Sequence, residues 1–345
     1  MATRALITGG SGYFGTVLAG AADAAGMDVA IFDLHAPDSA DFDGFDVDYV
    51  AGDIRDRAAV RASCEGVDVV FHNVAQVPLA KDRDLFESVN VTGTANLLIA
   101  ARDAGVGKVV HTSTSAIYGI PAHNPVTEDT TPTPVEDYGR AKLTGERLCA
   151  DAVAAGLDVT IIRPRTIMGH GRLGIMAMLF ELIAAGAPIP LLGRGGNRYQ
   201  FVHAEDLASA CLLASQRSGP TSYNIGATEF GTLRETLQPL IDHAGTGSRI
   251  QPLPLGAARL AMKAASLAHL VPLAPYHWLL YGESLYFDCT KAESELGWKA
   301  TRSNAEMMIE SYDWFLAHRD SLEAGGSVHQ SPAKLGVLKV LEYLP

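Results

Sequence analysis

The 345-residue sequence has little positive charge and few cysteines. It holds 27 Lys and Arg against 39 Asp and Glu, a formal net charge of −12, and its basic residues form no cluster. A nucleic-acid surface needs a basic footprint, so we expect small-molecule substrates and no nucleic acid as partners. The 4 cysteines are scattered without C-x-x-C spacing. That pattern predicts buried thiols in a reducing compartment rather than disulfides or metal ligands.

Long apolar runs and metal-ligand spacings are also missing. No segment has the ~18 uncharged apolar residues that a membrane span requires. The first expected strand begins at residue 3 or 4, which leaves no room for a signal peptide. We therefore expect a cytoplasmic protein without a transmembrane segment. The histidines show neither H-x-x-x-H nor close Cys/His spacing, which predicts no metal site.

The sequence does show strands and helices in alternation up to about residue 163. Apolar strands are expected near 4–8, 28–33, 47–51, 68–73, 107–113 and 158–163. Helical segments are expected near 13–26, 57–65, 84–104 and 136–155. This alternation predicts an α/β fold with a doubly wound parallel sheet and helices on both faces.

A glycine-rich loop joins the first expected strand to the first expected helix. Gly10, Gly12 and Gly15 form G-x-G-x-x-G, and Gly9 adds an overlapping register. Glycines let a pyrophosphate approach the backbone, and the free N–H groups of the helix start bind that anion. The glycines alone also fit a plain loop, but the flanking strand and helix favour a Rossmann-type dinucleotide site. The cofactor contacts expected here are Gly9, Gly12, Tyr13, Phe14 and Gly15.

Asp33 ends the second expected strand, about 20 residues beyond the glycines, where an acid accepts the hydroxyls of an adenosine ribose. No Arg or Lys follows Asp33 closely, so a 2′-phosphate would meet a carboxylate without a nearby cation. The sequence therefore favours NAD over NADP. Asp53 suits the adenine amine, although a plain surface aspartate fits equally well. Further cofactor contacts are expected at Asp53, Ile54, Val74, Ala75 and Gln76.

Tyr138 and Lys142 lie four residues apart at the start of the helix expected over 136–155, so their side chains share one face. A tyrosine acts as acid and base near neutrality only if its pKa falls from ~10 toward 7, a change of ~4 kcal/mol. A lysine at ~4 Å contributes on the order of 4 kcal/mol at an effective dielectric of ~20. The pair alone also fits an ordinary solvated helix.

Hydroxyl-bearing residues end the strand expected over 107–113 and continue to Ser115. A hydroxyl there holds a substrate carbonyl or carbinol oxygen beside the tyrosine while the nicotinamide gives or takes a hydride. Donor, acid/base and cation then converge on one oxygen. This arrangement removes most of the ambiguity that Tyr138 and Lys142 leave.

These motifs, taken in order, resemble the extended short-chain dehydrogenase/reductases, the group of NAD-dependent epimerases/dehydratases and 3β-hydroxysteroid dehydrogenases. The resemblance covers nearly the whole chain. Its marks are Thr8–Gly15, Asp33, Gly52 with Asp53, Phe71–Ala75, Asn90, Thr112–Gly119, Tyr138 with Lys142, Arg163 with Pro164, Phe201–His203 with Asp206, and Leu296–Trp298.

Carried over by position, the resemblance implies a role for each catalytic residue. Thr114 is the catalytic hydroxyl, Tyr138 the general acid/base, and Lys142 the group that lowers the tyrosine pKa and binds the nicotinamide ribose. Asn90 supports the site structurally. The cofactor-binding set implied beyond the loops above is Asn90, Thr112, Tyr138, Lys142 and Arg163. The resemblance also suggests a homodimer through the helices near 84–104 and 136–155.

Departures from the family pattern narrow the reaction. Nucleotide-sugar dehydratases and decarboxylases carry an acid just after the catalytic hydroxyl, where this chain has Ser115 and Ala116. Loss of water is therefore disfavoured. Thr166 and Met168 replace the Asn and Tyr of sugar-nucleotide enzymes. Arg165 and Arg198 remain candidates for binding a diphosphate, although Arg165 also fits a residue that faces solvent. The substrate contacts expected are Ser115, Arg165, Thr166 and Arg198.

The second half of the chain predicts a smaller lobe. Apolar residues such as Leu267, Val271 and Trp278 dominate Leu253–Phe287, like the hydrophobic-substrate lobe of hydroxysteroid dehydrogenases, with plain core packing as the alternative. We expect an NAD-binding domain over 1–165, a mixed α/β substrate lobe over 166–324 and a tail over 325–345. We expect the tail to pack on the body or on a partner subunit, with peripheral membrane contact as the alternative.

The sequence therefore predicts an NAD-dependent oxidoreductase. It would transfer a hydride to or from a secondary alcohol or ketone of a bulky, largely apolar, sterol-like substrate. A UDP-sugar 4-epimerase that retains its NAD is the alternative. A non-enzymatic dinucleotide sensor is a third reading, disfavoured because a sensor has no need of Thr114, Tyr138 and Lys142.

Overall fold

The computed structural model describes residues 2–38, 42, 44–76, 83–174, 176–254, 256 and 282–320. These residues divide into two compact units. The first unit takes the described parts of Met1–Arg165, Ala204–Gly226 and Phe287–Lys299, and the second takes those of Thr166–His203, Ala227–Tyr286 and Ala300–Pro345. The chain thus returns to the first unit twice after residue 165. The apolar residues 257–281 and the tail over 325–345 lie outside the described residues.

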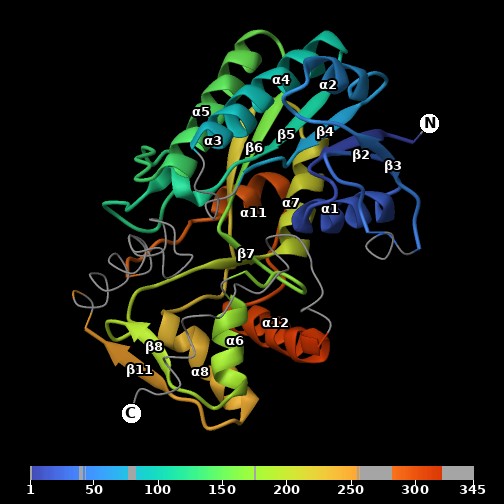
Figure 1. The fold of residues 1–345 in the computed structure, drawn as a ribbon. Helices are drawn as coiled ribbons and strands as arrows, with labels where there is room; N and C mark the ends of the chain where they lie inside the picture. The colour runs from blue at the N-terminus through green and yellow to red at the C-terminus, as the bar shows by residue number, and fades with distance from the viewer. Residues whose placement is uncertain are drawn as a thin grey trace. The chain divides into compact units, whose positions relative to one another are not determined.

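A seven-stranded parallel sheet forms the centre of the first unit, in the order β10-β6-β5-β4-β1-β2-β3 (Figure 1). Its strands are β1 (Arg4–Thr8), β2 (Asp28–Asp33), β3 (Asp48–Ala51), β4 (Val69–His72), β5 (Lys108–Thr112), β6 (Val159–Pro164) and β10 (Thr221–Ile225). The predicted doubly wound, Rossmann-type sheet is confirmed.

The inner strands are short apolar runs because both of their faces are covered. All four residues of β4 are buried, and in β1 only Arg4 is not. Leu6 of β1 lies opposite Ala30 of β2 and Val70 of β4, so the strand order reverses at β1. Ligands of such sheets bind outside the carboxyl ends of the strands at this reversal. The loops after β1 and β4 therefore occupy the expected ligand-binding edge.

Helices cover both faces of this sheet (Figure 1). One face carries α2 (Arg57–Ser63), α4 (Thr94–Asp103) and α5 (Asp137–Ala154), and the other carries α1 (Tyr13–Ala24), α7 (Ala204–Gln216) and α11 (Thr290–Leu296). The helix predicted over 84–104 is three elements: α3 (Arg83–Phe86), the π-helix η2 (Glu87–Gly93) and α4. A short 3₁₀ helix, η3 (Ser115–Tyr118), follows β5.

The second unit has its own apolar core, which includes Phe180, Leu240, Met307, Tyr312 and Phe315. It contains two small parallel sheets, β7 (Thr166–Met168) with β9 (Phe201–His203) and β8 (Ile189–Leu192) with β11 (Ile250–Leu253). Its helices are α6 (Met176–Ala184), α8 (Leu233–Ala244) and α12 (Asn304–His318). Reciprocal capping boxes begin both α8 and α12 and satisfy backbone N–H groups there.

Two expectations from composition can be compared with this fold. All four cysteines are buried and free, as predicted, and burial raises the pKa of the Cys64 thiol to about 11. Among the described residues, no helix is long and apolar enough to cross a membrane.

Candidate active site

The glycine loop after β1 is folded tightly against itself. Gly9 has a φ of 73°, in the left-handed region that favours glycine. A Cβ on Gly15 would lie 2.1 Å from the Gly9 carbonyl oxygen, so no larger residue fits there. A Cβ on Gly12 would lie 3.3 Å from the same oxygen. Packing within the loop therefore requires glycine at position 15, whereas at position 12 there is nearly enough room for a Cβ atom.

The start of α1 is suited to an anion. Gly12 is the N-cap of this 12-residue helix, no side chain caps it, and the first turn contains no acidic residue. The N–H groups and the positive end of the helix dipole favour a phosphate at such a position. The predicted residues Tyr13 and Phe14 are buried in this first turn. The loop therefore fits the pyrophosphate of a dinucleotide.

Asp33 lies at the carboxyl end of β2 beside the glycine loop. Its Oδ2 accepts a hydrogen bond of 3.2 Å from the backbone N–H of Ser11, and its Oδ1 accepts one of 3.3 Å from that of His35. Asp53 receives the Arg55 guanidinium at 2.9 Å, which holds the pKa of its carboxyl below the usual range. Ile54 beside it is buried. The ribose and adenine contacts of these residues stay predictions.

Asn90 of η2 fastens the segment that leaves β4. Its Oδ1 accepts a hydrogen bond of 2.7 Å from the Gln76 N–H, and its Nδ2 donates one of 3.0 Å to the Gln76 carbonyl oxygen. Asn90 is buried. This pair of bonds holds the backbone of Gln76, the last of the predicted cofactor-binding residues Val74, Ala75 and Gln76 that follow β4.

Lys142 is the most deeply buried of the predicted catalytic residues. Only 2% of it is exposed, and its Nζ donates a hydrogen bond of 2.6 Å to the Thr112 carbonyl oxygen at the end of β5. Burial lowers the pKa of Lys142 from 10.5 to about 8, against opposing effects of Cys149 and Glu146. The structure thus joins α5 to the carboxyl end of β5 through a lysine that titrates near neutrality.

Tyr138 lies on α5, and Thr114 lies two residues after the end of β5, so this bond joins the segments that carry them. Tyr138 is half-buried in the first turn of α5, its ring centroid 6.4 Å from that of Phe86. Glu136 caps this turn and accepts hydrogen bonds of 2.8 and 2.6 Å from the N–H groups of Tyr138 and Gly139. Thr114, also half-buried, caps η3 directly after β5. Sequence reasoning missed Glu136, although an acid two residues before Tyr138 was the available signal.

A buried polar network lies behind these residues. Ser113 Oγ donates a hydrogen bond of 2.5 Å to Glu146 Oε1, and the Arg163 guanidinium donates two to the same carboxylate, at 3.0 and 2.8 Å. Arg163 also donates to the Tyr118 hydroxyl at 2.8 Å. Glu146 lies one turn beyond Lys142 on the same helical face, which was the available signal for it. The cofactor contact expected of Arg163 stays a prediction.

Two buried histidines lie beneath this site. The imidazole of His72 lies 2.7 Å from the Thr8 hydroxyl and 3.0 Å from that of Thr94, and burial lowers its pKa to about 3. The ring centroid of His111 is 5.2 Å away, and burial also lowers the pKa of this imidazole well below its usual value. Both are therefore neutral near pH 7. In the part of the chain that the structure describes, no group of three or more His, Cys, Asp or Glu is arranged to hold a metal ion.

The expected substrate residues divide between the units. In the first unit, Arg165 Nη1 donates a hydrogen bond of 2.7 Å to the Ser115 hydroxyl, and both residues are buried. The solvent-facing alternative for Arg165 is therefore wrong, since only 2% of it is exposed. In the second unit, the Thr166 hydroxyl lies 2.8 Å from that of Tyr199. Arg198 is exposed, and its guanidinium carbon lies 4.8 and 4.5 Å from the ring centroids of Phe230 and Tyr286.

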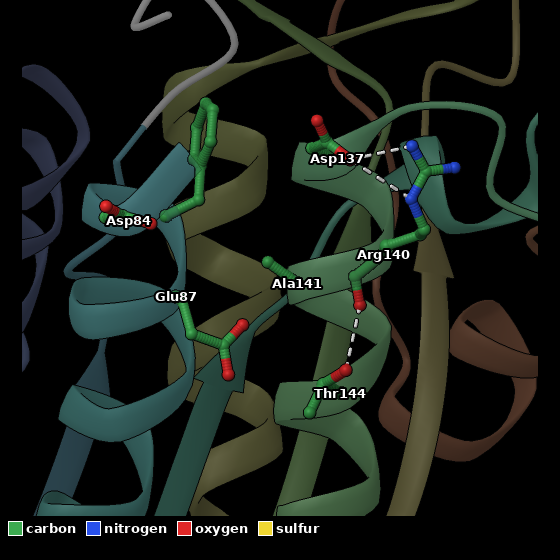
Figure 2. Close-up of a pocket in the computed structure, with 7 residues that line it drawn as sticks. Asp84, Glu87, Asp137, Arg140, Ala141 and Thr144 are labelled. Carbon is green, nitrogen blue, oxygen red and sulfur yellow. Dashed lines mark hydrogen bonds and ion pairs between the residues drawn. The ribbon is translucent and has the colours of Figure 1, made fainter. Parts of the chain in front are cut away.

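A cavity of about 400 Å³ lies on another side of α5. Figure 2 shows Glu87 on one wall and Arg140 on the other, with Arg140 bonded to Asp137. The lining residues are Asp84, Phe86, Glu87, Asp137, Arg140, Ala141 and Thr144, and they include neither Thr114 nor Lys142. The homodimer expected through these helices stays a prediction.

Known proteins resemble both the sequence and the fold. The profile of the NAD-dependent epimerase/dehydratase family matches residues 5–226. Protein y4nG of Sinorhizobium fredii is 52% identical over 98% of this chain and 85% of its own length. Sterol demethylase protein B of Methylococcus capsulatus is 31% identical over 90% of this chain and 97% of its own. The structure of Thermus thermophilus UDP-glucose 4-epimerase with NAD has a TM-score of 0.72 and 27% identity, covering 91% of this chain and 99% of that one.

Proposed function

Because the chain belongs to the NAD-dependent epimerase/dehydratase family, we propose that it is an oxidoreductase acting on a bulky, largely apolar, sterol-like secondary alcohol or ketone. Membership of this family makes it an enzyme of the extended short-chain dehydrogenase/reductase type with NAD as its cofactor. The observation that carries the proposal is the buried Lys142 ammonium at the end of β5, on the helix that also holds Tyr138.

We assign the cofactor-binding residues to the carboxyl edge of the sheet, where ligands of this fold bind. The start of α1 would bind the pyrophosphate, because its N–H groups meet neither a capping side chain nor an acid. Asp33 would accept the adenosine ribose hydroxyls, and Lys142 would donate to the nicotinamide ribose. When bound, NAD would accept the hydride through its nicotinamide. The protein itself supplies binding, orientation and proton transfer.

The proton step would fall to Tyr138. In the oxidation direction its phenolate takes the carbinol proton, and in the reduction direction its phenol returns a proton to the carbonyl oxygen. A cation nearby favours the phenolate, and Lys142 is the cation that α5 provides one turn further on. The Thr114 hydroxyl would donate to the same substrate oxygen and hold it beside the tyrosine. Thr114, just after β5, and Tyr138, at the start of α5, would thus act on the same substrate oxygen.

Two observations support an apolar substrate. Thr166 and Met168 stand in place of the polar pair, Asn and Tyr, that is expected for a sugar nucleotide. The similarity to sterol demethylase protein B extends over nearly the whole of both chains. A pocket for a sterol-like compound needs apolar walls and few polar groups.

A UDP-sugar 4-epimerase remains the second candidate, supported by Arg198. Its guanidinium is exposed and stacks over the neighbouring rings of Phe230 and Tyr286, which makes it a preorganised cation of the kind that binds phosphate. The similarity to UDP-glucose 4-epimerase also favours it. In such an enzyme NAD stays bound and returns the hydride to the same carbon.

Thermal-shift and turnover assays with NAD distinguish the two candidates. We expect a hydroxysteroid to stabilise the protein and to reduce NAD, and UDP-glucose to do neither. Tyr138→Phe should lower turnover roughly 10²-fold or more with NADH binding nearly unchanged, because the ring stays and only the proton relay is lost. Stabilisation by UDP-glucose that is lost in Arg198→Ala would instead establish the epimerase.

A further inference from the structure

His72 ends β4 at the centre of the sheet and forms hydrogen bonds through both nitrogens of its ring. It lies directly opposite Thr8, the last residue of β1. Its Nδ1 is 2.7 Å from the Thr8 hydroxyl oxygen, and its Nε2 is 3.0 Å from that of Thr94, the first residue of α4. All three residues are buried. One imidazole thus joins the strand that leads into the glycine loop to a helix that covers the sheet.

The protons of these groups fix the direction of each bond. A hydroxyl has a single proton, and a carbonyl oxygen can only accept one. The Thr94 hydroxyl donates its proton to the Asn90 carbonyl oxygen at 2.8 Å, so it accepts from His72. The ring proton of His72 therefore lies on Nε2, and Nδ1 accepts from the Thr8 hydroxyl. Burial lowers the pKa of His72 to about 3, so the ring is neutral near pH 7 and Nδ1 stays an acceptor.

The same chain of hydrogen bonds continues to the segment after β4. Asn90 holds both backbone groups of Gln76, through bonds of 2.7 and 3.0 Å. At the other end, Thr8 directly precedes Gly9, and a Cβ on Gly9 would lie 3.0 Å from the Val74 backbone nitrogen. The glycine loop is therefore packed closely against the segment after β4, and a buried chain of hydrogen bonds joins the two beneath the carboxyl edge of the sheet.

We propose that His72 is a positioning residue for the cofactor: through Thr8 and Thr94 it fixes the glycine loop relative to the segment after β4 before NAD binds. His72 does not contact NAD itself. A site that is already held in its binding conformation loses less conformational freedom when the ligand binds, so this preorganisation raises the affinity. The inference rests on the proposed binding of NAD at the carboxyl edge and is independent of the proposed substrate.

His111 provides a matched control on the neighbouring strand. It lies directly opposite His72 in the register of β4 and β5, is equally buried, and has its ring centroid 5.2 Å from that of His72. Within the described part of the chain, neither ring nitrogen of His111 has a hydrogen-bond partner. The two imidazoles thus share their burial and surroundings and differ in their hydrogen bonds. Leucine at either position removes a buried ring, but only at position 72 does it interrupt the chain of bonds.

Fluorescence titration with NADH compares wild type, His72→Leu and His111→Leu. We expect the dissociation constant for NADH to rise roughly threefold to tenfold in His72→Leu, the range for an ordinary hydrogen bond, and to stay unchanged in His111→Leu. His72→Asn keeps an acceptor for Thr8, and His72→Gln keeps a donor for Thr94. Each amide should therefore recover part of the lost affinity, which a role in core packing alone would not produce.

NMR of the imidazole nitrogens in histidine-labelled protein tests the direction of the bonds without cofactor or substrate. The His72 signals are those that disappear in His72→Asn. We expect the proton on Nε2 and a bare Nδ1 near pH 7. The opposite tautomer would set a bare Nε2 against the Thr94 hydroxyl oxygen, and finding it would overturn the proposal.

The outcomes of the titration separate this inference from the proposed function. If wild type does not bind NADH, the proposed cofactor site fails, and this inference fails with it. If wild type binds NADH and folded His72→Leu binds it equally tightly, or if His111→Leu loses as much affinity, only the role of His72 is refuted. Urea unfolding shows whether each variant is folded. Should His72→Leu not fold, Thr94→Val interrupts the same chain at α4 with the shape of the side chain kept, and unchanged NADH affinity in that variant would refute the role equally.

Discussion

Lys142 Nζ donates its 2.6 Å hydrogen bond to the carbonyl oxygen of Thr112, so the helix that carries Tyr138 is tied to the strand that leads into Thr114. The bond places a buried cation where α5 packs against the carboxyl end of β5. In the proposed reaction this charge is required, whereas burial makes the same charge costly to the fold.

The pH dependence of activity should show this lysine. Because burial lowers the pKa of Lys142 to about 8, the ammonium that favours the Tyr138 phenolate is lost above that pH. We expect kcat/KM to fall as pH rises through about 8. A Lys142→Arg variant, whose side chain keeps its charge, should not show this fall in whatever activity it retains. Profiles of kcat/KM against pH for both proteins, measured with the same alcohol and NAD, test whether Lys142 causes this fall. The same fall in Lys142→Arg would show that another group causes it.

The stability of the fold should rise over a pH range in which the activity falls. Between about pH 8 and 10.5 the unfolded chain keeps a proton that folded Lys142 has lost, so the free energy of unfolding rises with pH in that window. The size of the effect is about 3 kcal/mol. Urea unfolding of wild type and Lys142→Met at pH 8 and pH 10 isolates it. A difference between the two proteins that does not change with pH would contradict the lowered pKa.

Alanine substitutions at two glycines of the loop should have different effects: one should destabilise the fold, and the other should weaken NADH binding. In Gly15→Ala the new Cβ would meet the Gly9 carbonyl oxygen at 2.1 Å, and overpacking of this kind costs typically 1–3 kcal/mol of stability. In Gly12→Ala the Cβ would lie 3.3 Å from that oxygen, so the fold should survive and NADH binding should weaken. Thermal unfolding and NADH fluorescence titration measure the two effects. Normal NADH binding by Gly12→Ala would place the pyrophosphate elsewhere.

Glu146 should be more important to the fold than any exposed acid on the same helix. Glu146→Gln leaves the buried Arg163 guanidinium without its counter-ion, and breaking a buried pair costs about 3–5 kcal/mol. It also weakens the anchor of Ser113, next to Thr114, so activity should fall as well. The control is Asp137→Asn, whose exposed pair with Arg140 contributes at most about 1 kcal/mol. Equal losses for the two variants in urea unfolding would show that the network does not stabilise the fold.

The strands of the sheet could be predicted from the sequence more completely than the contacts of the residues around the candidate site. Strands covered on both faces contain unbroken apolar runs such as Val69–Phe71, and the bounds of the six predicted strands agree with the observed ones within one residue. The seventh strand, β10, was not predicted, because it follows the sixth by more than 50 residues and joins the sheet only through pairing with β6. The helix predicted over 84–104 was one element, because hydrophobic periodicity cannot distinguish the wider turn of η2 from an α-helix. Arg165 was equally hard to place, since its burial depends on Ser115, 50 residues away in the chain, and on Phe287. Pairings at such separations leave no local pattern.

Asp33 should determine the preference of the protein for NADH over NADPH. Asp33 is the last residue of β2, and its carboxylate accepts a hydrogen bond from the Ser11 N–H of the glycine loop. Removing the charge should therefore weaken this bond to the loop and the proposed bonds to the ribose at the same time. Asp33→Asn keeps the shape of the side chain but not its charge. NADH affinity should fall by about 1.5–3 kcal/mol, the value of a charge-assisted hydrogen bond, while NADPH gains because the repulsion of its 2′-phosphate is removed.

Asp28, at the opposite end of the same strand, is the matched control for Asp33. It pairs with Arg4 at 2.6 Å, far from the carboxyl edge where ligands of this fold bind. Asp28→Asn should leave both cofactor affinities unchanged in fluorescence titrations with NADH and NADPH. If Asp33→Asn bound NADH as tightly as wild type while Asp28→Asn did the same, the carboxylate at the end of β2 would not be the ribose ligand. The preference for NAD would then have to come from residues other than Asp33.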